Sequence, residues 1–371
     1  MAEWKASCRG NREKQERGRT GGSKGGLFLP DQPPVIVPVF LPFQGCKGRC
    51  VFCDQKAITS IDEKGVSTET IVRFLSDAFS KTRRHEGKKV IVAFYGGTFT
   101  NNPLPVIRQI LAATSSFREK GLFSSIRVST RPDSLEEEKL LLMKEYGVDT
   151  VELGVQSMND DVLNRAGRGH SSEHTRDAFY LLKSLGFEVG AQLMAGLPGD
   201  SPAIFMDSVE EVIALRPSMV RLYPTVVIEG TALAGLYAGG RYTPLGLEET
   251  VSLCAQALAR FEEEQIQVIR IGLAPSQELI EGRRMIDGPW HPCLGFLVRS
   301  RHYLQKAIKS LPSSDWMGLD VRVRVPSREI TLLRGFRNQG LSALKAELSA
   351  KTLTVTPDDS IARGKLVVEP I

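Results

Sequence analysis

The sequence predicts an α/β protein, a partial (β/α) barrel of the TIM type followed by a small C-terminal α+β appendage. From Val35 onward, short β-branched segments alternate with longer amphipathic ones, which favours parallel strands joined by right-handed crossover helices. After about residue 315 this alternation stops. A doubly wound open sheet is the alternative fold. In both folds, the loops that follow the carboxyl ends of the strands carry the chemistry.

The predicted strands are short, and turn or helix signals separate them. Ser134 with Glu137 predicts a capping box at the start of one helix, and Gly186 and Pro217 predict the ends of two others. The predicted helices are Leu135–Tyr146, Thr175–Leu185 and Pro202–Leu215. The predicted strands are Val35–Phe43, Val90–Gly96, Ile126–Thr130, Thr150–Gln156, Val189–Ala195, Val220–Val227 and Gln267–Ile271.

Three regions are predicted along the chain. Residues 1–30 are rich in Gly, Ser, Arg and Lys and lack apolar periodicity, which predicts a flexible basic tail. The barrel is expected over residues 31–314 and the appendage over residues 315–371. Within the appendage we expect strands over Val321–Val325, Glu329–Leu333 and Lys365–Glu369 and a helix over Leu341–Leu348.

Composition narrows the possible classes of protein. The 371 residues are 42% hydrophobic and 25% charged, with a net charge of +5, so an anionic partner such as RNA is permitted but not demanded. The longest apolar stretch, Val35–Phe43, is shorter than the ~20 residues that cross a bilayer. Basic residues interrupt the N-terminus, which has no apolar segment typical of a signal peptide. We therefore expect a cytoplasmic protein without a membrane span.

Three of the six cysteines, Cys46, Cys50 and Cys53, lie close together directly after the first predicted strand. Such clustering indicates metal binding rather than disulfides. Thiolates at positions 1, 5 and 8 of one loop can hold three corners of a 4Fe–4S cluster and leave the fourth iron open. S-adenosylmethionine (SAM) chelates such an iron, and one electron from the cluster then cleaves it to a 5′-deoxyadenosyl radical.

A zinc site is the main alternative, completed by Cys8, Cys254, Cys293 or a histidine. The commoner zinc pattern combines two pairs of close cysteines, whereas the remaining cysteines of this sequence are isolated. That spacing favours iron–sulfur. An electron-transfer ferredoxin is disfavoured because its clusters need a fourth cysteine.

Several motifs, in order, resemble the radical SAM superfamily. They begin with the cysteine triplet, in which Phe52 precedes the last cysteine, and with residues 94–100 (FYGGTFT) at the end of the second strand. More narrowly, residues 129–133 (STRPD), 152–157 (ELGVQS) and 221–225 (RLYPT) resemble the catalytic subunit of Elongator, a tRNA wobble-uridine modifying enzyme. The resemblance covers about residues 33–300.

The resemblance implies which residues bind SAM. Gly96 and Gly97 would offer carbonyls to its amino group, although a turn that needs positive φ is a compatible explanation. Thr98 stands where the wider superfamily has a glutamate, as the resemblance to Elongator implies. Ser129 would bond the ribose and Arg131 the methionine carboxylate. A structural arginine that caps the next helix is the alternative for Arg131.

Further residues would line the same pocket. The resemblance places Gln156 at the ribose or the reacting centre, with an amide that bonds a loop as the alternative. Phe52 resembles the aromatic whose backbone meets adenine, and Leu197 lies in a segment that resembles the one packing against that base, although a turn that starts a helix also explains it. Gln192 and Tyr223 are candidates for substrate contact.

A polar loop after the fourth strand holds Arg165, Arg168 and His170. These residues could bind an anionic substrate or the methionine carboxylate, and a solvated loop is the alternative. The loop over residues 334–340 joins a predicted strand to a helix and is a weak candidate for clamping phosphate.

These observations predict a radical SAM enzyme with a 4Fe–4S cluster, whose adenosyl radical abstracts hydrogen from an organic substrate, with a tRNA nucleoside as one candidate. The Elongator subunit carries an acetyltransferase domain after the barrel, which this sequence lacks, so acetyl transfer is not expected. A small molecule or cofactor precursor is the competing substrate class. A non-catalytic iron–sulfur protein that binds RNA is the competing function. An electron donor such as flavodoxin or ferredoxin is the expected partner, and no catalytic residue is predicted.

Overall fold

The computed structural model describes residues 34–55, 57, 66–80, 88–274, 276–311 and 316–371. The chain divides into two compact units, one over Leu29–Pro292 and one that includes Cys293–Ile371. The predicted tail over residues 1–30 lies outside the described residues. Among the described residues, no helix is both long enough and apolar enough to span a membrane.

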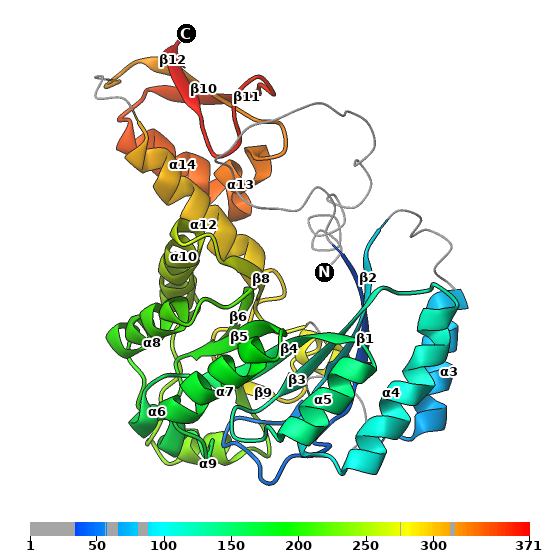
Figure 1. The fold of residues 1–371 in the computed structure, drawn as a ribbon. Helices are drawn as coiled ribbons and strands as arrows, with labels where there is room; N and C mark the ends of the chain where they lie inside the picture. The colour runs from blue at the N-terminus through cyan, green and yellow to red at the C-terminus, as the bar shows by residue number, and fades with distance from the viewer. Residues whose placement is uncertain (1–33, 56, 58–65, 81–87, 275, 312–315) are drawn as a thin grey trace. The chain divides into compact units, whose positions relative to one another are not determined.

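The first unit is built on a curved sheet of seven strands, all parallel and in the order of the chain (Figure 1). A doubly wound sheet would reverse its strand order at a switch point. The unbroken order therefore confirms the predicted partial barrel. Each of the seven predicted strands is present: β1 (Val35–Phe40), β2 (Val90–Tyr95), β3 (Ser125–Thr130), β4 (Val148–Gln156), β5 (Glu188–Ala195), β6 (Met219–Pro224) and β8 (Gln267–Ile271).

Helices alternate with these strands and cover the outer face of the sheet (Figure 1). Their apolar residues recur at helical spacing and are buried, as with Ile107, Ile110 and Leu111, so packing on the sheet stabilises each helix. The helices of this unit are α3 (Thr68–Ser80), α4 (Leu104–Glu119), α5 (Glu137–Glu145), α6 (Asp160–Arg165), α7 (Ser172–Ser184), α8 (Pro202–Ala214), α9 (Ala232–Ala238), α10 (Leu247–Glu263) and α11 (Gln277–Ile280). Of these, α9 packs against the cysteine loop, and α11 follows the last strand of the sheet.

The predicted capping box at Ser134 is wrong. Helix α5 begins at Glu137, and its N-cap, Glu136, makes no side-chain capping bond. Ser134 belongs to the turn that follows β3, because its amide donates to the carbonyl of Arg131 and its carbonyl accepts a bond from the Thr100 hydroxyl. The tertiary contact therefore holds Ser134 outside the helix.

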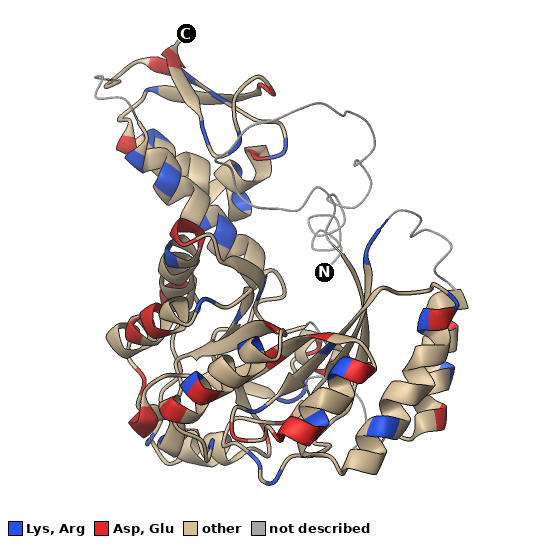
Figure 2. Ribbon diagram, in the orientation of Figure 1, with Lys and Arg blue, Asp and Glu red and all other residues tan. Residues whose placement is uncertain are grey.

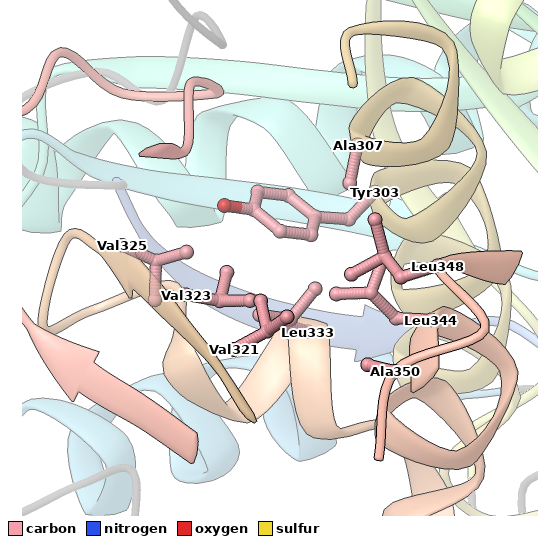
Figure 3. Packing of buried hydrophobic residues seen from close by; sticks show 9 residues of the cluster. All are labelled: Tyr303, Ala307, Val321, Val323, Val325, Leu333, Leu344, Leu348 and Ala350. Atoms are coloured by element: carbon pink, nitrogen blue, oxygen red, sulfur yellow. The ribbon is translucent and has the colours of Figure 1, made fainter. Parts of the chain in front are cut away.

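The second unit has a three-stranded sheet with β10 at its centre, parallel to β11 and antiparallel to β12. Val321, Val323 and Val325 alternate along β10 and pack against Tyr303 and Leu333 in a buried cluster (Figure 3). The elements are α12 (Leu294–Lys309), β10 (Asp320–Val325), α13 (Ile330–Arg334), α14 (Gln339–Glu347), β11 (Thr352–Pro357) and β12 (Val367–Pro370).

One secondary-structure prediction is wrong in this unit, and one strand was not predicted. The segment Glu329–Leu333 is helical rather than extended, because Leu333 is buried in the cluster and Glu329 accepts a bond of 2.9 Å from the Tyr303 hydroxyl. Packing thus overrides the local β-propensity. Strand β11 was not predicted. The unit also contains α12, which the predicted boundary at residue 314 assigned to the barrel.

Candidate functional site

The cysteine loop follows β1 and is held against the end of β2. The Gln55 side-chain oxygen accepts bonds from the amides of Phe43 (2.6 Å) and Gly97 (3.0 Å). Gly96 and Gly97 have φ of +81° and +49°, and a Cβ on Gly97 would lie 2.2 Å from the carbonyl oxygen of Gln44. Both glycines therefore allow the positive φ and the close backbone approach that this loop requires.

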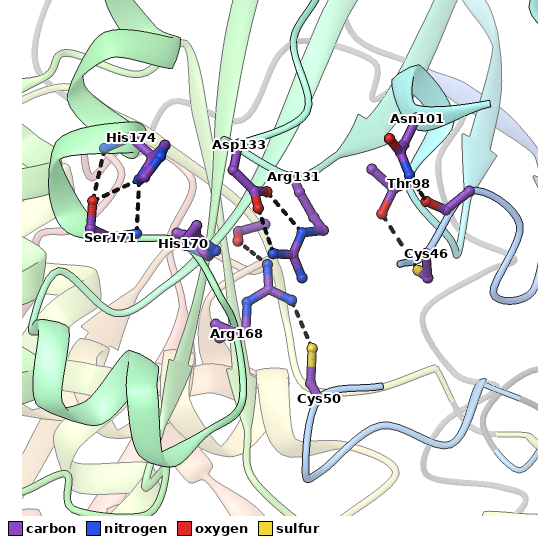
Figure 4. A network of polar contacts seen from close by, with 12 residues as sticks. Cys46, Cys50, Thr98, Asn101, Arg131, Asp133, Arg168, His170, Ser171 and His174 are labelled. Atoms are coloured by element: carbon purple, nitrogen blue, oxygen red, sulfur yellow. Dashed lines mark hydrogen bonds and ion pairs between the residues drawn. The ribbon is translucent and has the colours of Figure 1, made fainter. Parts of the chain in front are cut away.

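Two of the three thiols contact residues from later strands (Figure 4). The Cys46 sulfur lies 3.4 Å from the hydroxyl of Thr98, which follows β2. The Cys50 sulfur accepts a bond of 3.1 Å from Nη1 of Arg168, which follows β4. The fold thus brings residues 118 positions apart together at the carboxyl ends of the strands.

The three thiols fit an iron–sulfur cluster by their chemistry. Burial raises the pKa of Cys53 to about 12 and that of Cys46 above its usual value, and the charge of Cys50 adds to both shifts. The three thiols thus lie within range of one another's charge, and deprotonating them together requires a cationic centre, which iron supplies. Across the described residues, no three or more His, Cys, Asp or Glu side chains are placed to hold a metal ion. The match to an iron–sulfur cluster therefore depends on the chemistry of the three thiols and not on their present geometry.

Arg131 forms a bidentate ion pair within its own loop. Its Nε and Nη2 atoms donate to the two carboxylate oxygens of Asp133 at 2.8 and 2.7 Å (Figure 4). Burial by itself would raise the pKa of Asp133, but the hydrogen bonds and charge of Arg131 hold it below its usual value. Asp133 is thus ionised at neutral pH, and it occupies the Nε–Nη2 edge of the guanidinium.

The polar loop after β4 separates into an inner and an outer part. Arg168 and His170 are buried. Nη2 of Arg168 donates to the Gly154 carbonyl at 2.6 Å, and Nε2 of His170 lies 3.2 Å from the Val155 carbonyl. Burial and the charge of Arg168 lower the pKa of His170 to about 3. Arg165, by contrast, is 60% exposed and pairs with an aspartate on its own helix, as a solvated loop predicts.

Gln156 ends β4 in a strained conformation. Its φ is +67°, which is uncommon for a residue other than glycine. The pairing of β4 with β5 shifts register between Leu153 and Gln156, and such irregularities re-aim side chains next to active sites. The Gln156 side-chain oxygen is buried without a hydrogen-bond partner, so it is available to a ligand.

Three residues predicted to lie near the adenine and the substrate meet in one apolar cluster. Leu197 is buried with Val162 and Met194, and Phe52 and Tyr223 pack against them. They come from the cysteine loop, from β6 and from the segment after β5. Their positions in the sequence do not predict this contact. They meet because the carboxyl ends of parallel strands lie at the same edge of the sheet.

Comparison with known proteins identifies the family. Residues 40–212 match the model of the radical SAM superfamily, and residues 217–305 match that of the radical SAM C-terminal domain. The chain belongs to the radical SAM superfamily. This enzyme family accounts for the cysteine loop and the parallel strands together, and the resemblance found in the sequence is confirmed.

The relatives of this radical SAM enzyme include Elongator-type proteins. A tRNA uridine(34) acetyltransferase of Methanocaldococcus jannaschii is 36% identical over 73% of this chain and 56% of that protein. Human Elongator complex protein 3 is 31% identical over 51% of this chain and 40% of that protein. The chain thus spans about half the length of these relatives. A solved structure, the archaeal Methanocaldococcus infernus Elp3 with an N-terminal deletion, superposes with a TM-score of 0.58 at 23% identity and covers 74% of this chain and 64% of that one.

A buried polar cluster also lies between neighbouring strands of this radical SAM enzyme. We define the inner cluster as Tyr95, Arg127, Glu152, Gln192 and Arg221. The Glu152 carboxylate, 1% exposed, accepts bonds from Nη1 of Arg127 at 3.0 Å and from Nε of Arg221 at 2.6 Å. The Tyr95 hydroxyl accepts a bond from Arg221 at 2.5 Å, and the Gln192 amide donates to Glu152 at 2.9 Å.

Sequence reasoning missed Arg127 and Glu152 as site residues, although a signal was present. Arg127 and Ser129 are two residues apart on β3, as are Glu152 and Gly154 on β4, so each pair shares one face of the sheet. Charged residues at alternating positions of consecutive buried strands indicate a polar inner face. Figure 2 shows charged residues on strands of this sheet as well as on its outer helices.

Proposed function

We propose that this radical SAM enzyme binds a 4Fe–4S cluster through Cys46, Cys50 and Cys53, binds SAM beside it, and modifies a tRNA nucleoside. When bound, the cluster would supply the electron that cleaves SAM and so generates the radical that abstracts hydrogen from the substrate. The contact between Arg168 and the Cys50 sulfur carries this proposal, because it joins the cysteine loop to the strand ends that would hold SAM.

The SAM site would draw on residues at or after the ends of five strands, β1 to β5. Gly96 and Gly97 would present backbone to the amino group, and Ser129 and Gln156 would face the ribose. Phe52 and Leu197 would hold the adenine within the apolar cluster described above. Thr98 is fully buried beside Cys46, so in this proposal it supports the loop rather than binding SAM directly.

For the methionine carboxylate we propose Arg168 in place of Arg131. A carboxylate held at the open iron would need an arginine next to the cysteine loop. The charges of Arg131 and Arg168 both favour the Cys46 thiolate, so both lie near that loop, and their hydrogen bonds distinguish them. Arg168 already contacts Cys50, and its Nε atom is buried without a partner. Arg131 instead donates Nε and Nη2 to Asp133, and a carboxylate on that edge would have to displace Asp133.

A tRNA substrate is supported by the names of the relatives, several of which are tRNA uridine(34) acetyltransferases. The chain's mildly basic balance is compatible with an RNA partner. The competing function is an RNA-binding protein that holds a cluster but does not cleave SAM. The first experiment tests for SAM cleavage and so separates this function from the proposed one.

The first experiment measures cluster content and SAM cleavage in the same anaerobic preparation. We expect the reconstituted protein, given SAM and dithionite or reduced flavodoxin, to form 5′-deoxyadenosine. Alanine at Cys46, Cys50 or Cys53 should abolish the product and the iron–sulfur signal in electron paramagnetic resonance. Cys254→Ala is the matched control, because Cys254 is buried in helix α10. A loaded cluster that forms no 5′-deoxyadenosine would contradict the proposal.

The second experiment separates the two arginines by equilibrium binding of SAM to the reduced, cluster-loaded protein. Loss of a hydrogen bond between a charged donor and a carboxylate weakens binding by about tenfold or more. Arg168→Gln should show this loss, whereas Arg131→Gln should change the dissociation constant only slightly. The opposite order would assign the carboxylate to Arg131. Comparing tRNA nucleosides and metabolites of cells with and without the gene then tests tRNA against a small-molecule substrate.

A further inference from the structure

The inner cluster holds one more positive charge than negative charge. Arg127 and Arg221 share the single carboxylate of Glu152, and guanidinium groups stay protonated in proteins. Tyr95 does not balance them, because burial and the charge of Glu152 raise its pKa and keep the phenol neutral. Within the part of the chain that the structure describes, no second carboxylate lies within ion-pair distance of either guanidinium.

The surplus is centred on Arg127. Arg221 places Nε and Nη2 on the two oxygens of Glu152, at 2.6 and 3.0 Å. Arg127 donates Nη1 to one of those oxygens, while its Nε atom is buried and has no hydrogen-bond partner. The side chain is only 7% exposed. An uncompensated charge and an unused donor on one buried guanidinium are both costly, and an anion would relieve both.

The position of the inner cluster suits the substrate better than the cofactor. On β3, Arg127 precedes Ser129 by two residues, and on β4, Glu152 precedes Gln156 by four. The cluster therefore lies farther from the carboxyl ends of the strands than the residues proposed for SAM. Gln192 connects the two levels, because its amide lies 3.4 Å from the Ser129 hydroxyl and 2.9 Å from Glu152. Tyr95 and Gln192 are half-buried.

We propose that the inner cluster is a binding site for an anionic oxygen group of the substrate, a carboxylate or a phosphate, with Arg127 as its principal donor. This inference rests on the proposed function, since it places the substrate next to SAM. The guanidinium fork recognises both groups in the same bidentate manner. A nucleotide substrate would supply phosphate, and a small-molecule substrate would supply carboxylate.

The test uses the full-length, cluster-loaded protein without SAM or reductant. Sodium phosphate or sodium acetate is titrated at constant ionic strength, and the dissociation constant is measured by calorimetry and the thermal midpoint by scanning fluorimetry. We expect at least one of the two anions to bind and to raise the midpoint. Binding should weaken about tenfold or more in Arg127→Gln and less in Arg127→Lys, which keeps the charge but not the fork.

Arg260→Gln is the matched control, because Arg260 forms ion pairs on the outer surface of α10 and its loss should leave anion binding unchanged. Arg127→Gln removes the surplus charge, so its midpoint without anion should equal or exceed that of the unmodified protein. If this variant does not fold, Arg127→Lys provides the same comparison with the control. Binding of phosphate alone assigns a phosphate site and binding of acetate alone a carboxylate site.

Two results would overturn the inference: no binding of either anion, or equal binding by Arg127→Gln and the unmodified protein. Formation of 5′-deoxyadenosine by the unmodified protein is measured separately. A protein that binds the anion through Arg127 but never cleaves SAM keeps the anion site and rejects the proposed function. A protein that cleaves SAM but binds neither anion keeps the proposed function and rejects the anion site.

Discussion

Glu152 in the barrel and Glu369 in the C-terminal unit have the same chemical arrangement in different surroundings. Glu152 is shared by Arg127 and Arg221 and is 1% exposed. Glu369 is likewise shared by two arginines of β10, at 3.5 and 3.2 Å, but its side chain is 32% exposed. Water screens the charges around Glu369, whereas the charges around Glu152 lose their hydration when the protein folds.

The two sheets explain this difference. In the C-terminal unit, the alternation along β10 sends valines into the helix-covered core and arginines to the opposite, more exposed face. In the barrel, the helices cover the outer face, and the inner face carries the inner cluster. A buried charge network is weak evidence for stability, because apolar residues could fill the same space. Its presence inside the barrel therefore favours a role in binding.

The largest expected effect compares Glu152→Gln with Glu369→Gln. Removing the carboxylate of Glu152 leaves two buried guanidinium groups facing each other, and breaking a buried pair in this way costs about 3–5 kcal/mol. The same change at Glu369 should have little effect, because its arginines remain solvated. Urea denaturation at pH 7, with hydrogen exchange to follow β4 and β10 separately, measures both free energies.

Equal losses of unfolding free energy in Glu152→Gln and Glu369→Gln would contradict this comparison, because burial would then not determine how much a shared carboxylate stabilises the fold. Adding salt provides a second control. With sodium chloride as the salt, the small contribution of Glu369 should decline further with ionic strength, whereas that of Glu152 should largely persist because buried pairs are screened much less.

A smaller effect concerns pH. Burial and Arg168 hold the pKa of His170 at about 3, against 6.5 in the unfolded chain. Below pH 6.5 the His170 imidazole therefore binds a proton in the unfolded state but not in the folded state, so stability falls as pH falls from 6.5 toward 3. The loss is about 2 kcal/mol between pH 6.5 and 5. His170→Gln should remove that slope, measured as the difference between variant and unmodified protein in urea denaturation across this range.

The difference measurement is needed because Asp200 acts in the opposite direction. Burial raises its pKa to about 6, so its contribution favours the folded state toward acid pH.

The C-terminal unit should lose stability only at lower pH. Hydrogen bonds from Ser360 and Arg324 lower the pKa of Asp358 to about 2, so its stabilisation is lost only as pH falls from about 3.8 toward 2. A matching slope in that unit between pH 6.5 and 5 would contradict this distinction.

Much of the barrel could be predicted because its elements follow local rules. The β-branched segments that end at Thr130 and Ala195 are buried strands, and the predicted cysteine loop lies at the end of β1. The segment Glu329–Leu333 could not be predicted in the same way. Its local preference is extended, and only the contacts of Leu333 and Glu329 within the second unit make it helical.

The candidate site shows the same division. Motifs in the sequence indicated the types of residue that we propose to bind a cluster and SAM, but not which of them contact one another. Asp133 engages Arg131, and Arg168 reaches Cys50 across 118 positions. Sequence spacing does not reveal such partners, because each depends on which loops meet at the rim of the sheet.

By itself, the sequence determined the order of strands and helices, the cysteine triplet and the family to which the motifs point, since these depend on local periodicity and on residue type. Only the tertiary structure decided which guanidinium meets which anion. That choice depends on distance and desolvation, which exist once parallel strands bring Arg127, Glu152 and Arg221 onto one buried face. A carboxylate that two arginines share is partly exposed in one unit of this chain, and in the other it belongs to the buried cluster that we propose as an anion site. Burial there removes the competing water.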